Sequence, residues 1–357
     1  MTNDSTKKLV TISHDGIQVL RFFAISWVVG FHFFSRWSHL FPYGQIVDNM
    51  FFDVGWLGVN LFFIISGYVI GLSLQKTVKF RVFAKKRILR LLPSLFIILP
   101  LIYVVNQVIA ESPFKEISTI PNLIISLFLI PPSAANLLLD LHLNWITLVL
   151  WSLKVEVIFY LLISLIYFSL AKKRTFEILV SVSILSTFAL VANRLDFSFG
   201  PMDFFYRTVI ALGWNHLSWF LVGLALQRYA WNSVANRIKI FSLILFSHIP
   251  LLIEGQSLDV LMCGLTMSIL TAITIVWARV LPKHWRPLVV LGNSSYEMYL
   301  LHQNIGVTIS LKLSSGINAT SSSSLIIVLL SIASSFLLSH YIFRIILIIR
   351  RRFVWKE

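Results

Sequence analysis

The stretch at residues 17–36, IQVLRFFAISWVVGFHFFSR, decides the fold class of this chain. It is apolar over the roughly 20 residues that a helix needs to span a bilayer, yet it carries two ionisable side chains, Arg21 and His32, before the arginine that ends it, Arg36. Eleven steps of about 100° return to within about 20° of the starting direction, so a helix places both side chains on one stripe, about 16 Å apart. Ionisable residues inside a membrane usually face a bundle interior or a watery cavity. The pair indicates a functional site, with a snorkelling arginine and a structural core histidine as the alternative.

Apolar runs of spanning length recur along all 357 residues. The composition is 57% hydrophobic and 13% charged, whereas soluble domains carry about 25% charged residues. The polar N-terminus lacks a small-residue cleavage site, so no cleavable signal peptide is expected. We predict an all-α, polytopic integral membrane protein. About ten spanning helices are expected, at residues 17–36, 56–75, 91–109, 146–170, 175–193, 208–228, 238–253, 259–280, 288–310 and 323–349.

The stretch at residues 120–139 is also apolar, but Pro121, Pro131 and Pro132 interrupt it. The positive-inside rule assigns loops rich in Lys and Arg to the cytoplasm. If this stretch crossed the membrane, the three basic residues at 172–174 would lie outside; if it does not cross, they lie inside. We therefore predict a partial, re-entrant or interfacial element here, with both termini of the chain in the cytoplasm.

The formal net charge of +15 follows this topology. Most of the 30 Lys and Arg residues fall in predicted cytoplasmic segments, and Arg21 and Lys154 remain within the membrane. The charge is therefore an orientation signal, and nucleic-acid binding is not expected. The single Cys263 leaves no disulfide framework and no cysteine metal site. No linker divides the chain, so we expect one integral-membrane domain over residues 1–357, without an appended soluble domain.

Residues 53–68, DVGWLGVNLFFIISGY, combine small and polar side chains at the start of the second predicted helix. Gly55, Gly58 and Gly67 allow close approach between helices. Asn60 needs a polar partner at its depth in the membrane, which makes it a candidate binding residue. Packing and helix capping alone are the alternative explanation of this stretch.

The loop at residues 76–90 holds seven cations and no acid. On a helix, Arg87 and Arg90 are three residues apart and share a face, and Lys86 precedes them. Guanidinium forks suit phosphate groups. The pattern predicts a clamp for a polyanionic ligand, with anchoring to anionic membrane lipids as the alternative.

Residues 151–160, WSLKVEVIFY, place two charged side chains in an apolar run. Lys154 and Glu156 are two residues apart, so they do not face each other on a helix. A glutamate within the membrane is a functional candidate, and Glu156 is a candidate for orienting His32. A structural intramembrane ion pair is the alternative. Polar groups are added by Trp151, Ser152 and Tyr160.

Residues 292–302, GNSSYEMYLLH, predict a capped helix with further polar side chains. Asn293 or Ser294 suits the N-cap, and Glu297 suits the positive end of the helix. Tyr296 and Tyr299 are typical of an interfacial aromatic belt. His302 lies too deep for such a belt and is a candidate site residue.

These stretches, in this order and at these spacings, resemble the membrane-bound acyltransferase-3 family. The family's Arg-x10-His motif is matched by Arg21 and His32, and its R-x-x-R motif by Arg87 and Arg90. Its other three motifs are matched by residues 58–70 (GVNLFFIISGYVI), 151–160 and 295–302 (SYEMYLLH). Two positions depart from the family pattern: many members have Asp in place of Asn60 and a second acid in place of Val157.

The resemblance implies O-acylation, usually O-acetylation, of an envelope or exported glycan at the bacterial inner membrane. The donor would be cytoplasmic acyl-CoA, acting as a substrate and not as a permanently bound cofactor, and no metal is implied. His32 would be the general base, assisted by Glu156; direct transfer and an acyl-enzyme both remain open. Donor binding would fall to Arg21, Lys86, Arg87 and Arg90. Acceptor binding would fall to Asn60, Trp151, Ser152, Tyr160, Tyr296 and His302.

A polysaccharide or lipid-linked sugar exporter is the alternative function, because many helices and an aromatic-rich interior would also serve export. Many transporters are built from inverted repeats, and no internal repeat is visible here. A cation-rich loop joined to an aligned Arg21 and His32 favours the acyltransferase, since an exporter requires neither feature.

Overall fold

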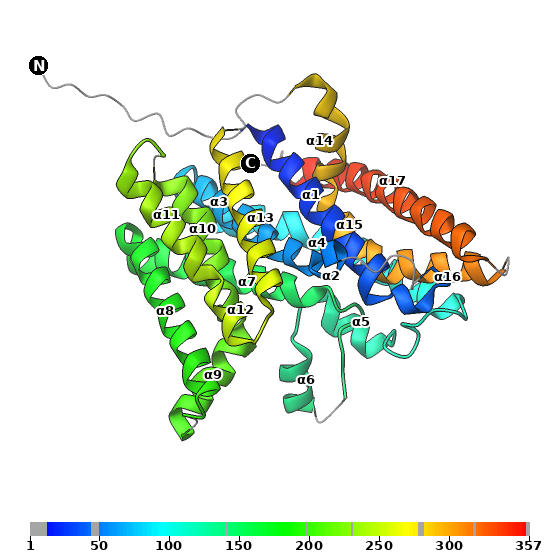
Figure 1. Cartoon of the computed structure of the whole chain (residues 1–357), viewed down its shortest axis with the longest axis horizontal. Helices are drawn as coiled ribbons and strands as arrows, with labels where there is room; N and C mark the ends of the chain where they lie inside the picture. Colours follow the sequence, from blue (N-terminus) through cyan, green and yellow to red (C-terminus); the bar gives the residue numbers. More distant parts are fainter. Residues whose placement is uncertain are drawn as a thin grey trace, which may run out of the picture. The chain divides into compact units, whose positions relative to one another are not determined.

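The computed structural model describes residues 13–43, 50–139, 142–197, 199–229, 231–277, 282–316 and 319–354. Over these ranges the regular structure consists of α-helices with short 3-10 and π-helical turns, and no strand is present (Figure 1). The predicted all-α class is confirmed.

Eight helical segments within the described ranges are long and apolar enough to cross a membrane, and one bent pair of helices brings the number to nine. The chain is therefore a multi-pass membrane protein, with one or two fewer continuous spans than the ten expected. The eight segments contain α1 (His14–Phe31), α3 (Gly58–Gln75), α4 (Phe80–Val108), α7 (Leu150–Leu165), α8 (Thr175–Arg194), α11 (Val234–Ser247), α13 (Leu258–Trp277) and α17 (Ser321–Val354).

The span predicted at residues 208–228 is bent. The helix α9 (Gly200–Leu212) and the segment Trp214–Arg228, which contains α10 (Leu217–Arg228), meet at 69°. Gly213 lies between them with φ of 68°, a left-handed backbone conformation that glycine adopts without a steric penalty. This glycine ends α9 and redirects the chain.

The span predicted at residues 288–310 is broken into short helices. They are α14 (Arg286–Asn293), α15 (Ser295–Leu301), the π-helical turn η8 (His302–Gly306) and α16 (Val307–Gly316). Ser294 separates the first two, with φ of −95° and ψ of 14°. From Ser295 onward, α15, η8 and α16 follow one another without a gap to Gly316. The one continuous helix predicted at residues 288–310 is therefore corrected to two helical pieces divided at Ser294, and neither is among the eight apolar spans of the described residues.

The stretch at residues 120–139 forms two short helices, α5 (Ile120–Leu127) and α6 (Pro132–Leu139). Each has a proline in its first turn, where the missing N–H costs nothing. The side chains of Asn122 and Ser126 accept hydrogen bonds from the backbone N–H groups of Asn144 and Ile146, at 2.9 and 3.0 Å. These bonds satisfy irregular backbone, and neither helix is long enough to span a membrane. The result agrees with the partial element predicted here.

The chain divides into two compact units, each assembled from separated parts of the sequence. Unit 1 takes the described residues up to Leu20 together with Asn60–Phe80 and Ile158–Arg286. Unit 2 takes Arg21–Val59, Arg81–Val157 and the described residues from Pro287 onward. Because the units interleave along the chain, no linker separates them, and the single domain expected at residues 1–357 stays a prediction.

Small residues permit close backbone approach in both units, as predicted. In unit 2, a Cβ atom on Gly58 would lie 2.6 Å from the carbonyl oxygen of Ala24 on α1. In unit 1, a Cβ atom on Gly67 would collide with the backbone of Phe220 on α10. Such contacts let helices associate by van der Waals packing where lipid provides no hydrophobic drive.

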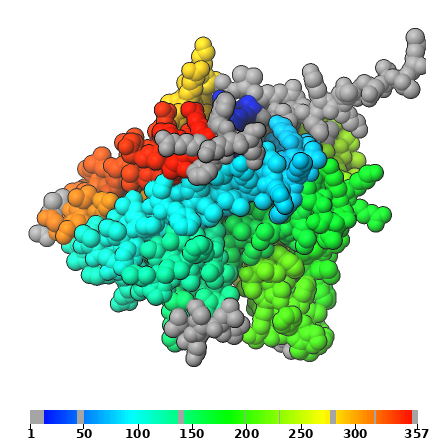
Figure 2. Space-filling view, turned by 180° about the vertical axis from the view of Figure 1, so that it is seen from behind, coloured from blue at the N-terminus to red at the C-terminus, as the bar shows by residue number. Residues whose placement is uncertain are grey.

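The outward surface of α4 is largely apolar. Its exposed side chains include Phe96, Val104 and Val108, and α4 with the residues that follow it covers much of the face in Figure 2, in light blue and cyan. Exposed apolar side chains in this number suit a helix solvated by lipid chains.

Candidate functional site

The predicted site residues gather in unit 2, apart from Asn60 and Tyr160, which belong to unit 1. Asn60 on α3 and Tyr160 on α7 are both buried, with 4% and 5% of their surface exposed.

His32 and His302 each begin a π-helical turn. His32 opens η1 (His32–Arg36) directly after α1, and His302 opens η8 directly after α15. A π-turn widens the helix by one residue and is often found at functional sites. Neither turn was predicted, because hydrophobic periodicity does not distinguish a π-turn from an ordinary helical turn.

The two imidazole rings are in contact. The His302 Nε2 atom lies 3.2 Å from the His32 Nδ1 atom, and the ring centroids are 4.6 Å apart with the planes at 79°. His302 is fully buried and His32 is partly exposed. The sequence predicted both as site residues but did not predict that they pair.

Backbone carbonyls assign the protons on these rings. The carbonyl oxygen of Val28 lies 2.9 Å from His32 Nδ1, and that of Tyr299 lies 2.9 Å from His302 Nδ1. A carbonyl oxygen only accepts, so both Nδ1 atoms carry the hydrogen. His302 Nε2 is then the second, more distant acceptor of the single His32 Nδ1–H hydrogen, which it shares with the Val28 carbonyl. The His32 Nε2 atom keeps its lone pair and makes no hydrogen bond among the described residues, which is the state of a general base.

Close packing holds the His32 turn in place. Phe33 is fully buried, and its backbone carbonyl accepts a hydrogen bond from the Tyr43 hydroxyl at 3.1 Å. On the other side, a Cβ atom added to Gly306 would lie 2.9 Å from the Phe33 ring. Since Gly306 ends η8, this contact brings the two π-turns together.

Glu156 lies beside Arg90, a pairing that the sequence did not predict. A Glu156 carboxylate oxygen is 3.8 Å from the Arg90 Nη2 atom, and the side chains are 14% and 25% exposed. Among the described residues, the hydrogen-bond partners of the His32 ring are the Val28 carbonyl and His302. The Glu156 carboxylate is not among these partners, and His302 is the side chain in contact with the His32 ring.

Ser152 links α7 to the helix that carries His302. Its hydroxyl lies 2.7 Å from the Tyr299 hydroxyl, and the Tyr299 hydroxyl also donates to the Val149 carbonyl at 3.3 Å. Glu156 is one turn after Ser152, so it faces the same side of α7. Tyr299 was expected in an interfacial belt, but it is buried within this cluster.

The predicted arginine pair lies on α4. Arg87 and Arg90 are one turn apart and share a face, and the Arg87 guanidinium carbon lies 5.4 Å from the Phe83 ring centroid. Lys86 points away from this face and is exposed. The Tyr296 hydroxyl donates a hydrogen bond of 3.3 Å to the Leu91 carbonyl. Tyr296, which the sequence predicted to bind the acyl acceptor, therefore lies beside the helical turn that carries the two arginines.

Arg350 on α17 is a further member of this region. Its Nη2 atom donates a hydrogen bond of 2.7 Å to the carbonyl oxygen of Arg90. Sequence reasoning counted Arg350 only as a topology signal, because it stands in a run of basic residues at the end of the chain. Arg350 and Arg90 are 260 positions apart in the sequence, so no local sequence pattern predicts their contact.

Glu297 is buried beside these arginines and does not lie at an exposed helix end. It is 1% exposed, and one of its carboxylate oxygens accepts a hydrogen bond of 2.7 Å from the Ser94 hydroxyl. It interacts electrostatically with Arg350 and Arg90. Glu156, Glu297, Arg90 and Arg350 form a charged cluster between α4, α7, α15 and α17, in which Glu297 is buried and the other three are partly exposed.

Arg21 and Trp151 are the remaining predicted site residues of unit 2. Arg21 lies on α1, and the continuous helical segment His14–Arg36 also contains His32, as the stripe argument requires. Trp151 is the second residue of α7 and is 38% exposed. Among the described residues, no group of three or more His, Cys, Asp and Glu side chains is arranged to hold a metal ion.

The chain belongs to the acyltransferase-3 family. The family described as "Acyltransferase domain" matches residues 14–343, nearly the whole chain. No curated protein and no solved structure matches the chain. Membership makes the protein a membrane acyltransferase. The matched residues include His32, His302, Arg87 and Arg90, whereas Arg350 on α17 lies beyond them.

Proposed function

We propose that the protein is an O-acyltransferase of the bacterial inner membrane. It moves an acyl group, most simply acetyl, from cytoplasmic acyl-CoA to a hydroxyl of an envelope or exported glycan such as O-antigen or exopolysaccharide. The observation that carries this proposal is the lone pair of His32 Nε2, set beside His302 in a chain of the acyltransferase-3 family.

His32 acts as the general base on the acceptor. Its Nε2 atom takes the proton of the glycan hydroxyl while the hydroxyl oxygen attacks the thioester carbonyl carbon. A C–O bond forms, the C–S bond breaks, and the CoA thiolate leaves. The thiolate then takes the proton from the His32 imidazolium, which restores the base.

His302 is a positioning residue in this scheme. Its Nε2 atom accepts from His32 Nδ1–H, and this hydrogen bond strengthens when His32 becomes positively charged. The Tyr299 carbonyl holds the His302 ring in the required tautomer. His302 orients His32 as a third group orients the catalytic base in other enzymes, and here that group is an imidazole instead of a carboxylate.

The arginine region binds the acyl donor. Arg87 and Arg90 offer guanidinium forks to the phosphates of CoA, with Lys86 nearby and Arg21 on the path toward His32. Glu156 fixes the Arg90 side chain through their 3.8 Å ion pair. Trp151, Ser152 and Tyr296, with Asn60 and Tyr160 of unit 1, remain candidates for contact with the acceptor.

The test of the catalytic assignment follows label from acetyl-CoA into envelope glycan. His32→Ala is expected to abolish incorporation. His39→Gln, at an exposed histidine in the 3-10 turn η2 (Ser38–Leu40) that follows the segment carrying His32, is expected to retain it. Equal label with His32→Ala and the unmodified protein would contradict the assignment. Movement of unmodified glycan across the membrane, without acyl transfer, would favour a polysaccharide exporter.

The test of the donor site compares two double variants. Arg87→Ala with Arg90→Ala is expected to raise the concentration of acyl-CoA needed for half-maximal rate. Lys79→Ala with Arg81→Ala removes the same charge from exposed positions of the same segment and is expected to leave it unchanged. If both pairs behave alike, the cations serve only to anchor the protein to anionic lipid.

A further inference from the structure

A cavity of about 540 Å³, including its open mouth, lies within unit 1. It is lined where α3 and α10 end and where α8 begins, together with the π-helical turn η4 (Ile166–Leu170) that follows α7. The space inside it that water-sized molecules can occupy is about 140 Å³, less than the roughly 300–1,000 Å³ of a site that encloses a whole small molecule, so it receives only part of a larger ligand. None of its lining residues has a role in the acyl transfer proposed above.

The lining combines apolar and basic side chains. Leu74, Ile163 and Leu224 provide aliphatic surface. Lys172 and Arg228 provide the positive charge, and no carboxylate lines the cavity. A ligand that satisfies this lining carries both a hydrocarbon portion and an anionic group.

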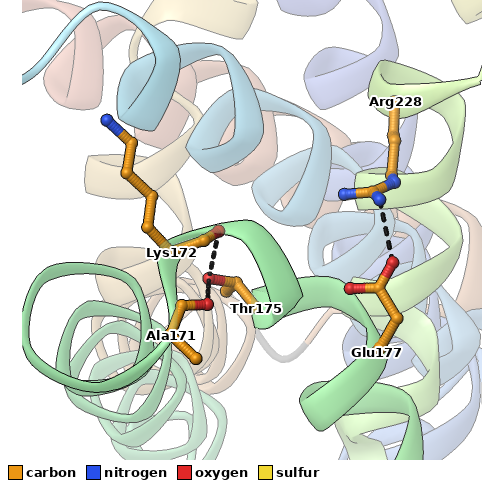
Figure 3. A network of polar contacts seen from close by, with 5 residues as sticks. All are labelled: Ala171, Lys172, Thr175, Glu177 and Arg228. Carbon is orange, nitrogen blue, oxygen red and sulfur yellow. Dashed lines mark hydrogen bonds and ion pairs between the residues drawn. The ribbon is translucent and has the colours of Figure 1, made fainter.

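A local network holds Lys172 at the cavity (Figure 3). The Thr175 hydroxyl donates to the carbonyl oxygens of Ala171 and Lys172, at 3.3 and 3.0 Å, and so fixes the turn that carries the lysine. The Lys172 ammonium lies 5.1 Å from the centroid of the Tyr167 ring. Among the described residues no carboxylate lies within ion-pair distance of this ammonium, so its hydrogen-bond donors remain available to an anion.

Arg228 is also held in a fixed position. Its Nη2 atom donates to Glu177 at 2.8 Å, as Figure 3 shows, and its guanidinium carbon lies 5.3 Å from the Phe176 ring centroid. A guanidinium has five N–H donors, and this ion pair uses one of them. Glu177 lies outside the lining, so the pair orients Arg228 without blocking the cavity.

We propose that this cavity binds an anionic phospholipid, with the lipid phosphate at Lys172 and an acyl chain against the aliphatic lining. A lysine ammonium suits a phosphate group, and apolar surface gains from contact with hydrocarbon. The basic residues at 172–174 are predicted on the cytoplasmic side, where the leaflet carries anionic lipids. The aliphatic lining favours a lipid over free phosphate, since inorganic phosphate would leave it exposed to water.

The test measures lipid retained by the full chain, and it requires no acyl transfer. The protein is purified in detergent with defined amounts of phosphatidylglycerol or phosphatidylcholine, and bound lipid is counted by native mass spectrometry. We expect Lys172→Gln to weaken phosphatidylglycerol binding about fivefold to tenfold. Lys173→Gln removes the same charge from the next residue, which does not line the cavity, and is expected to retain the lipid. Lys172→Arg keeps the charge and is expected to retain it as well.

Three results would overturn the proposal. The first is equal loss of phosphatidylglycerol in Lys172→Gln and Lys173→Gln, which would indicate general surface charge. The second is equal retention in Lys172→Gln and the unmodified protein. The third is phosphatidylcholine bound as tightly as phosphatidylglycerol. Competition with inorganic phosphate tests the phosphate subsite. If phosphate displaces phosphatidylglycerol only when Lys172 is present, the proposed subsite is supported. If phosphate binds without displacing the lipid, the two do not share a site, and this contradicts the proposed subsite.

Discussion

Replacing His302 with phenylalanine removes the acceptor that faces His32 while keeping an aromatic ring in a fully buried position. The lost contact is the 3.2 Å approach of His302 Nε2 to His32 Nδ1. A hydrogen bond to a group that becomes charged contributes about 1.5–3 kcal/mol, which corresponds to a decrease in kcat of about 10- to 150-fold. The KM for acyl-CoA should remain unchanged, because the arginines on α4 are untouched.

The assay is acyl-CoA-dependent labelling of glycan in membranes, corrected for the amount of protein present. His302→Gln offers a carbonyl oxygen at the same position, so it should recover part of the lost kcat. His39→Gln is the control for a histidine outside the pair. If His302→Phe keeps full kcat, or if both variants raise KM without lowering kcat, His302 does not position the base.

Three further predictions concern Arg350, Gly306 and the ion pair between Lys312 and Glu111. Arg350→Met should raise the KM for acyl-CoA about tenfold through loss of its charged hydrogen bond, with kcat retained; an unchanged KM would separate Arg350 from the donor site. Gly306→Ala, whose methyl group would approach an aromatic ring to 2.9 Å, should destabilise the fold by about 1–3 kcal/mol and lower Tm, whereas Gly316→Ala meets no atom within 4 Å and should not. The hydrogen bond from Lys312 lowers the pKa of the Glu111 carboxyl. The pair therefore stabilises the fold above the ordinary carboxyl pKa, and this stabilisation is lost as pH falls through the lowered pKa. Tm measured against pH should show the loss, and Glu111→Gln should abolish this pH dependence.

Much of the fold was predictable because membrane helices follow from local composition. An apolar run of about 20 residues must form a helix in a bilayer, since no other structure satisfies its backbone. The partial element at residues 120–139 followed from its prolines and from the charge of the loop at residues 172–174. The break at Ser294 was not predictable, because residues 288–310 are apolar enough to suggest one helix, and buried polar contacts interrupt it.

The candidate site was predictable in part. Spacing along one helix placed Arg21 with His32 and Arg87 with Arg90, because 3.6 residues per turn decides which positions share a face. The same reasoning offered Glu156 as a candidate partner of His32, whereas the structure places Glu156 beside Arg90 and His302 beside His32. A carboxylate on another helix has no register with His32 in the sequence, so only packing reveals that Glu156 faces Arg90.

The sequence by itself determined the class of this protein: a helical membrane chain with an Arg–His stripe and a basic loop, of the acyltransferase-3 family. Only the tertiary structure decided the partners of the functional side chains. His302 meets His32 across 270 positions, and Arg350 meets Arg90 across 260. Hydrophobicity and helical period act over one or two turns, whereas these contacts depend on how whole helices pack against each other.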